Sequence, residues 1–179
     1  MPKNRLPACL LTAVVSVVLT TAFAAEPAAS VKDAAVQVYF SPFGGAQDAI
    51  VNTIAKANSS VLVQAYSFGS LPIAQALIDA HKRGVRVQVL LDPSHAEDKK
   101  NLGDFIARAG IPVKIDAAHA KAHNKIMVID EEIVITGSYN FHPSSEDKVA
   151  ENLVIVTSKD LAAAYVKNWQ QHAEHSKAP

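Results

Sequence analysis

Four polar residues in the second half of the chain have types and spacings that suit chemistry on a phosphate group. His123 and Lys125 lie two residues apart, and Ser138 and Asn140 repeat that spacing further on. Because side chains alternate between the faces of a strand, each pair is expected to point to one side of its strand. An imidazole can attack phosphorus, while ammonium, hydroxyl and carboxamide groups can donate hydrogen bonds to phosphate oxygens. The spacing therefore predicts a phosphate-binding patch beside a nucleophilic histidine.

An antiparallel hairpin is predicted to bring the two pairs together. The apolar runs at 126–129 and 133–136 are predicted to be its strands, with the turn at Glu131-Glu132. We expect Asp130 to pair with Ile133. This register sets the polar residues opposite one another, Lys125 with Ser138 and His123 with Asn140. A three-residue loop would instead shift the register by one residue and separate the cluster.

Two acidic residues near the motif have predicted roles. Asp130 lies an odd number of residues from His123, so a regular strand points it away from the patch, and we expect it to brace the turn. Glu151 lies just before an apolar strand predicted at 152–157. An imidazole that attacks phosphorus must be neutral at one ring nitrogen and held by an acceptor at the other. Glu151 is the candidate for this acceptor.

Together these residues resemble the signature of the phospholipase D superfamily. His123-x-Lys125-x4-Asp130 is followed by Gly137-Ser138-x-Asn140 and then by Glu151. Over about 36–169 the chain resembles the small bacterial endonuclease branch of that family, including at Phe40-Ser41-Pro42, Ala65-Tyr66-Ser67-Phe68 and Arg83-Gly84. The resemblance implies a phosphodiesterase that needs no metal or cofactor. It implies catalytic roles for His123, Lys125 and Glu151 and phosphate binding by Lys125, Ser138 and Asn140. Asp130 and Gly137 also belong to the motif, and we expect both to be structural.

The geometry of phosphoryl transfer adds a requirement that one copy of the motif does not meet. In an in-line displacement the leaving oxygen departs opposite the attacking nitrogen, so His123 cannot also protonate it. The chain has a single His-x-Lys-x4-Asp motif, and the resemblance implies that small endonucleases pair two identical subunits. We therefore expect a homodimer in which one His123 is the nucleophile and the other is the general acid.

The rest of the chain alternates between apolar strands and amphipathic helices. This pattern predicts an α/β fold, an α/β/α sandwich with a mixed, largely parallel central sheet, phospholipase D-like. Besides the hairpin, strands are expected at 36–40, 61–68, 85–91, 111–115 and 152–157. Helices are expected at 47–57, between a Ser70 cap and Gly84, at 96–109 and at 159–175.

The first 24 residues have the features of a signal peptide. Lys3 and Arg5 precede a mostly apolar run, and Ala22-Phe23-Ala24 is a small-x-small cleavage motif. We expect cleavage between Ala24 and Ala25 and a periplasmic or secreted bacterial protein, with no stable membrane association afterwards. An uncleaved membrane anchor is the alternative.

Cleavage would leave a flexible leader at 25–35 and a single catalytic domain at 36–179. It would remove Cys9 and two of the 17 basic residues, leaving 15 basic against 17 acidic residues. A near-neutral protein has no broad basic surface for nucleic acid. A polyanionic substrate would therefore have to be held in a local groove.

Three functions are open at this stage. The first is a non-specific endonuclease that cleaves DNA, with RNA as a further substrate. The second is a phospholipase D-type hydrolase or transferase that acts on lipid phosphodiesters. It ranks lower because the mature chain has no long apolar loop or basic amphipathic helix suited to a membrane surface. The third is a non-catalytic module that binds phosphate or a partner protein, although every polar residue of the motif is present.

No metal site is predicted from the other histidines. His119 and His123 lie four residues apart, but they flank a strand and lack a Glu or Cys partner at a useful spacing. His172 and His175 lie near the end of the last helix and are expected to be solvated. The same helix carries an apolar stripe at helical spacing that is expected to pack in the core, namely Leu161, Tyr165 and Trp169.

Overall fold

The computed structural model describes residue 31, residues 34–94 and residues 98–179. The predicted signal peptide and nearly all of the predicted leader lie outside these residues, so both remain predictions. Within the described ranges, no helix combines the length and the apolar character needed to cross a bilayer.

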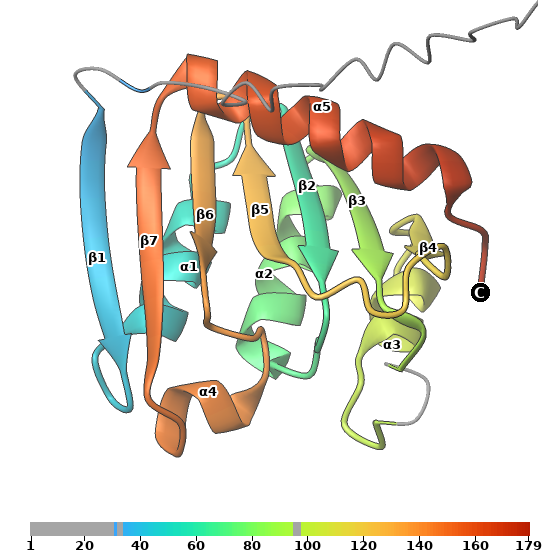
Figure 1. The fold of residues 1–179 in the computed structure, drawn as a ribbon, viewed down its shortest axis with the longest axis horizontal. Helices are drawn as coiled ribbons and strands as arrows, with labels where there is room; N and C mark the ends of the chain where they lie inside the picture. The colour runs from blue at the N-terminus through green and yellow to red at the C-terminus, as the bar shows by residue number, and fades with distance from the viewer. Residues whose placement is uncertain (1–30, 32–33, 95–97) are drawn as a thin grey trace, which may run out of the picture.

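A sheet of seven strands forms the middle of the molecule, in the order β1-β7-β6-β5-β2-β3-β4 (Figure 1). In chain order the strands are β1 (Ala35–Ser41), β2 (Ser60–Ala65), β3 (Arg86–Leu91), β4 (Val113–Ile115), β5 (Lys125–Ile129), β6 (Ile133–Gly137) and β7 (Glu151–Thr157). Among these strands, only β2–β3 and β3–β4 pair in parallel.

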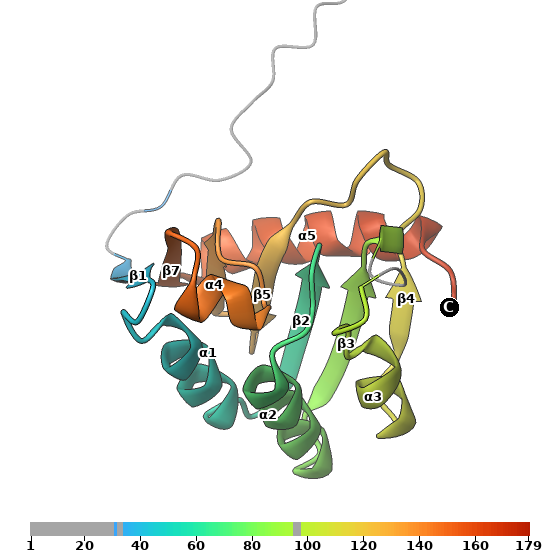
Figure 2. The same ribbon diagram turned by 90° about the horizontal axis from the view of Figure 1, so that it is seen from below.

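Helices cover both faces of this sheet (Figure 2). On one face lie α1 (Ala46–Ala55), α2 (Leu71–Lys82) and α3 (Gly103–Arg108), and on the other lies α5 (Lys159–His175). The short helix α4 (Pro143–Asp147) lies at one end of the sheet. The predicted α/β/α sandwich with a mixed sheet is confirmed. The expectation of a largely parallel sheet is wrong in detail, because the pairs β1–β7, β2–β5, β5–β6 and β6–β7 are antiparallel, whereas helical crossovers join β2 to β3 and β3 to β4 in parallel.

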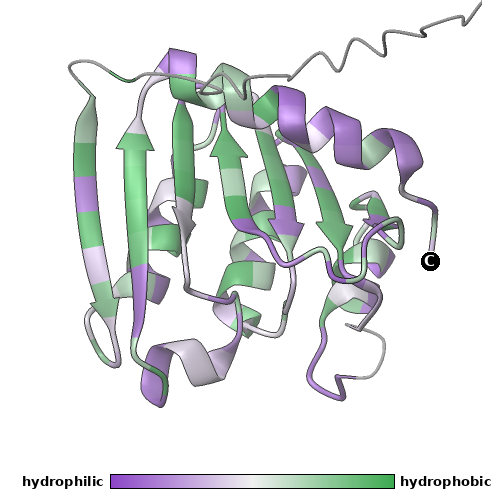
Figure 3. Ribbon diagram, viewed as in Figure 1, coloured by the Kyte–Doolittle hydropathy of each residue, from purple (hydrophilic) through white to green (hydrophobic). Residues whose placement is uncertain are grey.

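Apolar side chains fill both spaces between the layers. Ile50 and Leu77 of α1 and α2 are fully buried against the strands. On the opposite face, Trp169 of α5 packs with Leu62 and Val128, and its indole Nε1 donates a hydrogen bond to the Val63 carbonyl at 2.9 Å. The strands are correspondingly apolar in Figure 3, whereas α5 is hydrophilic along much of its length. The predicted stripe of α5 therefore packs in the core, since Leu161 and Tyr165 lie against the same cluster.

The predicted register of the hairpin is wrong by one residue. Ile129, not Asp130, pairs with Ile133, so the loop has three residues rather than two. Asp130 and Glu131 both have left-handed backbone conformations, with φ of 55° and 54°. Residues other than Gly and Asn seldom adopt that conformation, so the Glu-Glu turn gave no sequence signal for it. Continued along the strands, the observed register sets Lys125 opposite Gly137 rather than Ser138.

The other predicted elements differ from the structure mainly at their ends. The last helix spans 159–175 as expected, and the Ser70 hydroxyl accepts a hydrogen bond from the Ile73 amide at the start of α2. The helix predicted at 96–109 is shorter in the structure, because residues 98–102 are not helical and α3 spans Gly103–Arg108, and α4 was not predicted.

Candidate active site

Except for Asp130, the motif residues lie at or next to one end of the sheet's strands, the lower end in Figure 1. Strand β5 runs antiparallel to β2, so its first residue, Lys125, pairs with the last residue of β2, Ala65. Strand β7 starts with Glu151 at this same end of the sheet, next to the end of β6. The topology therefore brings together residues from segments that are distant in sequence.

Lys125 and His123 are in direct contact. The Lys125 ammonium lies 3.1 Å from both ring nitrogens of His123 and donates a hydrogen bond to the His123 carbonyl at 3.0 Å. Lys125 is buried, whereas His123 is exposed to solvent. A buried cation beside an accessible imidazole suits the capture of an anion within reach of a nucleophile.

Tyr66 forms a wall of this site that spacing alone did not predict. Its ring centroid lies 4.3 Å from that of His123, with the planes tilted by 54°. The Lys125 ammonium lies 4.9 Å from the centroid of the Tyr66 ring, and the Lys121 ammonium lies 5.9 Å from it, both within cation–π range. Tyr66 thus packs against the imidazole and the cations together. Its only sequence signal was its place in one of the segments that resemble the family.

Asp92 is a second residue that spacing did not predict. It follows β3 directly and is 2% exposed. Its carboxylate accepts hydrogen bonds from the Ser94 amide at 2.9 Å and from the Ala122 amide at 2.6 Å. Burial alone would raise the pKa of Asp92, but these hydrogen bonds and the nearby Lys121 hold it below its usual value. An anionic Asp92 therefore fastens the loop immediately before His123.

The electrostatics of the site favour a neutral His123. Partial loss of water around its ring lowers the pKa of His123 although the residue is exposed, and the positive charges of Lys125 and Lys121 lower it further, against the opposing effect of Asp92. Burial also lowers the pKa of Lys125, while Glu151 and Asp92 oppose that shift. Since a protonated imidazole has no lone pair with which to attack phosphorus, these shifts extend the pH range in which His123 can act as a nucleophile.

Glu151 lies close enough to stabilise the charge of Lys125. Within the described part of the chain it makes no hydrogen bond to His123, which was its predicted partner. Its backbone amide is instead held by the Ser41 hydroxyl at 3.2 Å, across the β1–β7 pair. The orienting role of Glu151 therefore stays a prediction, and the structure indicates Lys125 as its nearer target.

A backbone irregularity after β6 sets the positions of Ser138 and Asn140. The amides of Ser138 and Tyr139 both donate to the Asn152 carbonyl, at 3.1 and 3.2 Å. Gly137 has φ of 141°, and a Cβ there would lie 2.3 Å from that carbonyl, so only glycine fits. The Ser138 hydroxyl accepts hydrogen bonds from the Asn152 amide and carboxamide, at 3.1 and 3.3 Å, which leaves its own proton available to a ligand.

Asn140 borders a hollow beside the His123–Tyr66 contact. Its Oδ1 is buried without a hydrogen-bond partner among the described residues, so the carboxamide is available to a ligand. The hollow has a volume of about 620 Å³. Its lining includes Tyr66, Lys99, Lys100 and His142 besides Asn140. Asn140 thus lies near His123 through their common neighbour Tyr66, whereas Ser138 lies over β7.

Asp130 lies at the other end of β5, away from His123. Its carboxylate accepts hydrogen bonds from three consecutive amides at the start of β2, at 2.9, 2.8 and 3.0 Å, and from the Ser59 hydroxyl at 2.9 Å. Burial would raise the pKa of Asp130, but these hydrogen bonds hold it below its usual value. This geometry agrees with a structural role, and no contact links Asp130 to His123 or Lys125 among the described residues.

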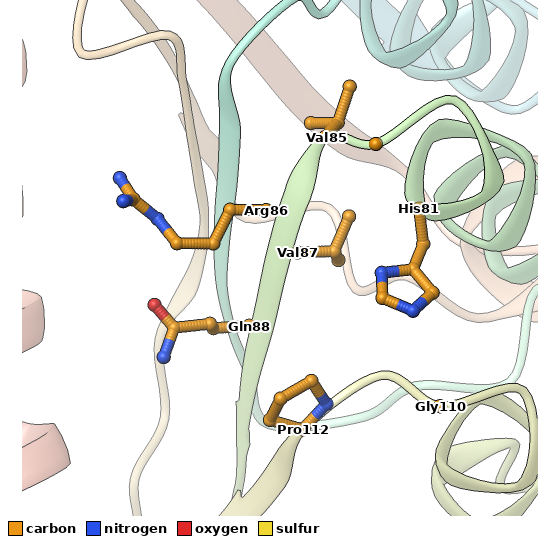
Figure 4. A pocket seen from close by; sticks show the side chains of 8 residues that line it. His81, Val85, Arg86, Val87, Gln88, Gly110 and Pro112 are labelled. Atoms are coloured by element: carbon orange, nitrogen blue, oxygen red, sulfur yellow. The ribbon is translucent and has the colours of Figure 1, made fainter.

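A second hollow, of about 420 Å³, lies at the start of β3 (Figure 4). It is lined by His81, Val85, Val87, Pro112 and the polar side chains of Arg86 and Gln88. The start of β3 lies at the end of the sheet opposite to His123 and Lys125. This hollow is therefore separate from the candidate site.

Known proteins are similar to this chain in sequence and in fold. Residues 50–173 match the family model described as the cardiolipin synthase, PLD-like domain. A phospholipase D from Rickettsia conorii is 41% identical over 134 residues, which are 75% of this chain and 67% of that protein. A mitochondrial cardiolipin hydrolase from Xenopus laevis is 30% identical over 115 residues, which are 64% of this chain and 55% of that protein.

Two solved structures are similar along their whole length. Nuc from Salmonella typhimurium, a phospholipase D family member, has a TM-score of 0.78 and 32% identity, covering 82% of this chain and 99% of that one. NucT from Helicobacter pylori has a TM-score of 0.75 at 20% identity, covering 82% of this chain and 100% of that one, and shows the shared fold. With the family model and the Rickettsia relative, these likenesses show that the chain belongs to the phospholipase D superfamily.

Proposed function

We propose that this protein is a metal-independent phosphodiesterase, an endonuclease that cleaves DNA, and also RNA, without sequence preference at a site shared by two subunits. The observation that carries the proposal is the contact between the buried Lys125 ammonium and the exposed His123 imidazole. Lys125 supplies a positive charge for the phosphate, and His123 supplies a nucleophile. The charge that binds the phosphate and the nitrogen that attacks it thus lie 3.1 Å apart.

The proposed reaction has two displacements at phosphorus. A neutral His123 nitrogen forms a bond to phosphorus as the bond from phosphorus to the leaving oxygen breaks, and that oxygen takes a proton from His123 of the partner subunit. Water then attacks the phosphohistidine and transfers its proton to His123 of the partner subunit. The P–N bond breaks, and the first His123 is again neutral. Lys125 holds the non-bridging oxygens throughout, with Asn140 and Ser138 as further donors.

Exposed apolar residues at the same end of the sheet support the shared site. Three of them lie in segments next to this end, Phe43, Leu71 and Val149, and their exposed fractions are 78, 57 and 42%. A monomer gains nothing from large apolar side chains in water beside its active site, whereas a second copy would bury them. The in-line geometry requires a second acid on the opposite side of the phosphate, so a second copy of this chain is the partner that satisfies both observations.

Local charge supports a nucleic acid as substrate. The hollow beside Tyr66 is lined by Lys99 and Lys100, together with the acidic Asp98, and the Lys121 ammonium lies 5.9 Å from the centroid of the Tyr66 ring. The three lysines place a small excess of positive charge around Tyr66, next to the nucleophile, in a protein with no overall basic charge. Such a local charge suits the phosphates that flank a cleaved bond in a polynucleotide.

A lipid phosphodiesterase is the second candidate function. The Rickettsia relative is named a phospholipase D, and the Xenopus relative is named a cardiolipin hydrolase. The exposed Phe43 and Leu71 would suit contact with lipid as well as a second subunit. Lipid and polynucleotide share the phosphodiester, so the chemistry of His123 and Lys125 serves either.

Parallel assays of the two substrates separate these functions. Wild type, His123→Ala and the control His81→Gln would be incubated in excess EDTA with supercoiled plasmid and with vesicles that contain cardiolipin. Circular dichroism would establish that each sample is folded at the assay temperature. We expect plasmid nicking by wild type and the control, and none by His123→Ala. Lipid hydrolysis without nicking would favour the second function. Nicking by folded His123→Ala, or its loss in EDTA while the protein stays folded, would refute the proposed mechanism.

A further inference from the structure

Three histidines and one aspartate that play no part in the proposed chemistry meet at the end of α5. Asp116 follows β4 directly, and His119 lies three residues later in the loop that leads to β5. His172 and His175 lie in the last turn of α5. One candidate ligand atom from each of the four side chains lies within 4.8 Å of all the others.

Asp116 is the centre of this cluster. Its side chain is completely buried, yet it accepts hydrogen bonds from His172 Nδ1 at 2.6 Å and from His175 Nε2 at 3.0 Å. A buried carboxylate thus has an imidazole nitrogen against each of its two oxygens. The expectation of a solvated side chain is wrong for His172, which is half-buried against Asp116, whereas His175 is exposed as expected although it contacts the same carboxylate.

His119 completes the cluster in a different way. Its ring centroid lies 4.9 Å from that of His172 and 5.2 Å from that of His175. Among the described residues it makes no hydrogen bond to Asp116. It is also exposed, and thus free to turn toward the other three side chains. Hydrogen bonds to Asp116 therefore explain where the His172 and His175 side chains lie. Among the described residues, no hydrogen bond explains the position of the His119 side chain.

The four donor atoms match the ligand set of a tetrahedral metal ion. Zinc binds His nitrogen and Asp oxygen at about 2.0–2.2 Å, which spaces the ligand atoms of a tetrahedral site about 3.3 Å apart. The atoms of the cluster lie within 4.8 Å of one another, so the largest separation exceeds this spacing by at most about 1.5 Å, and the exposed His119 and His175 are the side chains that an ion would draw in. Four protein ligands leave no open position for substrate, which is typical of a structural rather than a catalytic site.

We propose that Asp116, His119, His172 and His175 bind one divalent transition-metal ion of the zinc class, and that this ion clamps the end of α5 to the loop that carries His123. The neighbouring backbone supports the clamp. Ile115 and Lys177 exchange backbone hydrogen bonds at 2.7 and 3.0 Å, and Lys114 Nζ donates to the Ala173 carbonyl at 3.0 Å. The ion would extend this junction to His119, four residues before His123. It would stabilise the fold and order the loop, while the proposed reaction itself uses no metal.

Metal binding by the purified full chain tests the proposal. Protein stripped with a chelator and dialysed would be titrated with ZnCl₂ against a chromogenic competitor, and its thermal unfolding would be followed with and without zinc. We expect one ion per chain and an increase of about 5–10 °C in Tm at a free zinc concentration a hundredfold above Kd. A chain that binds no stoichiometric zinc near pH 7.5 would overturn the proposal.

His119→Gln is the deciding variant, because it removes a ligand without breaking a hydrogen bond of the metal-free protein. We expect its zinc affinity to fall at least about tenfold, with the Tm of the stripped protein unchanged. His172→Gln should lose zinc binding too, and if it fails to fold, His119→Gln still decides. The matched control is His81→Gln, which leaves the cluster intact and should bind zinc like wild type. Equal affinity in His119→Gln and wild type would show that the cluster is only a hydrogen-bonded Asp–His network.

Discussion

Replacing Asp130 separates a structural role from a catalytic one at a position that belongs to the family motif. Asp130→Ala removes an acceptor that holds three backbone amides and one hydroxyl at 2.8 to 3.0 Å. Hydrogen bonds to a charged group contribute about 1.5–3 kcal/mol each when buried, and these are partly exposed, so water replaces much of the loss. Alanine also tolerates φ of 55° less well than aspartate does.

From these contacts we expect Asp130→Ala to lower the free energy of unfolding by about 3 kcal/mol, and Tm by about 6–12 °C. Urea unfolding followed by circular dichroism would measure the first, and a thermal melt the second. Activity per folded molecule, assayed at low temperature, should stay within about twofold of wild type, because Asp130 lies at the opposite end of β5 from Lys125.

The pH dependence of this loss provides a control. The pKa of Asp130 is depressed in the folded protein, so its stabilising effect is fully present above the pKa of the unfolded chain, near 4. That effect disappears as the pH falls through the depressed pKa. The stability difference between wild type and Asp130→Asn should therefore be constant near neutral pH and vanish in strong acid. An Asp130→Ala protein with unchanged Tm and no activity would refute the structural assignment.

Three further predictions concern the site itself. Lys125→Ala should lower kcat/KM by about 10²–10³, because it removes a charge that stabilises the transition state. It should not lower Tm, because a buried charge is itself costly to the fold. A drop in Tm with unchanged kcat/KM per folded molecule would contradict this. Lys121→Gln should raise the pKa of His123 by removing a nearby cation, so the acidic limb of the kcat/KM profile should move to higher pH, and NMR titration of the imidazole should show the same shift. An acidic limb that stays in place would show that Lys121 does not act on His123. Gly137→Ala should destabilise the protein more than Gly84→Ala in urea unfolding, because both glycines have positive φ but only the first would place a Cβ against a carbonyl. Equal losses would show that the strand exit relaxes.

The sequence was most informative where local rules decide the structure. A serine cap and a stop at glycine bounded α2, and periodicity alone bounded α5 at its observed ends. The spacing of His123 and Lys125 predicted that their side chains lie together, and they are in contact, although His123 precedes β5 rather than lying on it. These inferences depend on neighbours within a few positions, which the sequence displays directly.

The sequence was least informative where distant segments meet. The hairpin register depends on two left-handed residues, and one of them, Asp130, is held by amides at the start of β2, about 70 positions away. Asp116 and His172 are separated by 56 positions, so nothing near either one indicated that a buried carboxylate would hold the histidines of α5. Tyr66 and Asp92 likewise reach the site only through the pairing of β2 with β3 and β5.

The stereochemistry at phosphorus tests the central claim most directly. A phosphorothioate diester of defined configuration would be hydrolysed by wild-type protein in isotopically labelled water, and the configuration of the product would be determined. Each in-line displacement inverts the phosphorus centre, so attack by His123 followed by attack of water predicts overall retention. Overall inversion would mean that water attacks the diester directly, and it would contradict a covalent intermediate on His123.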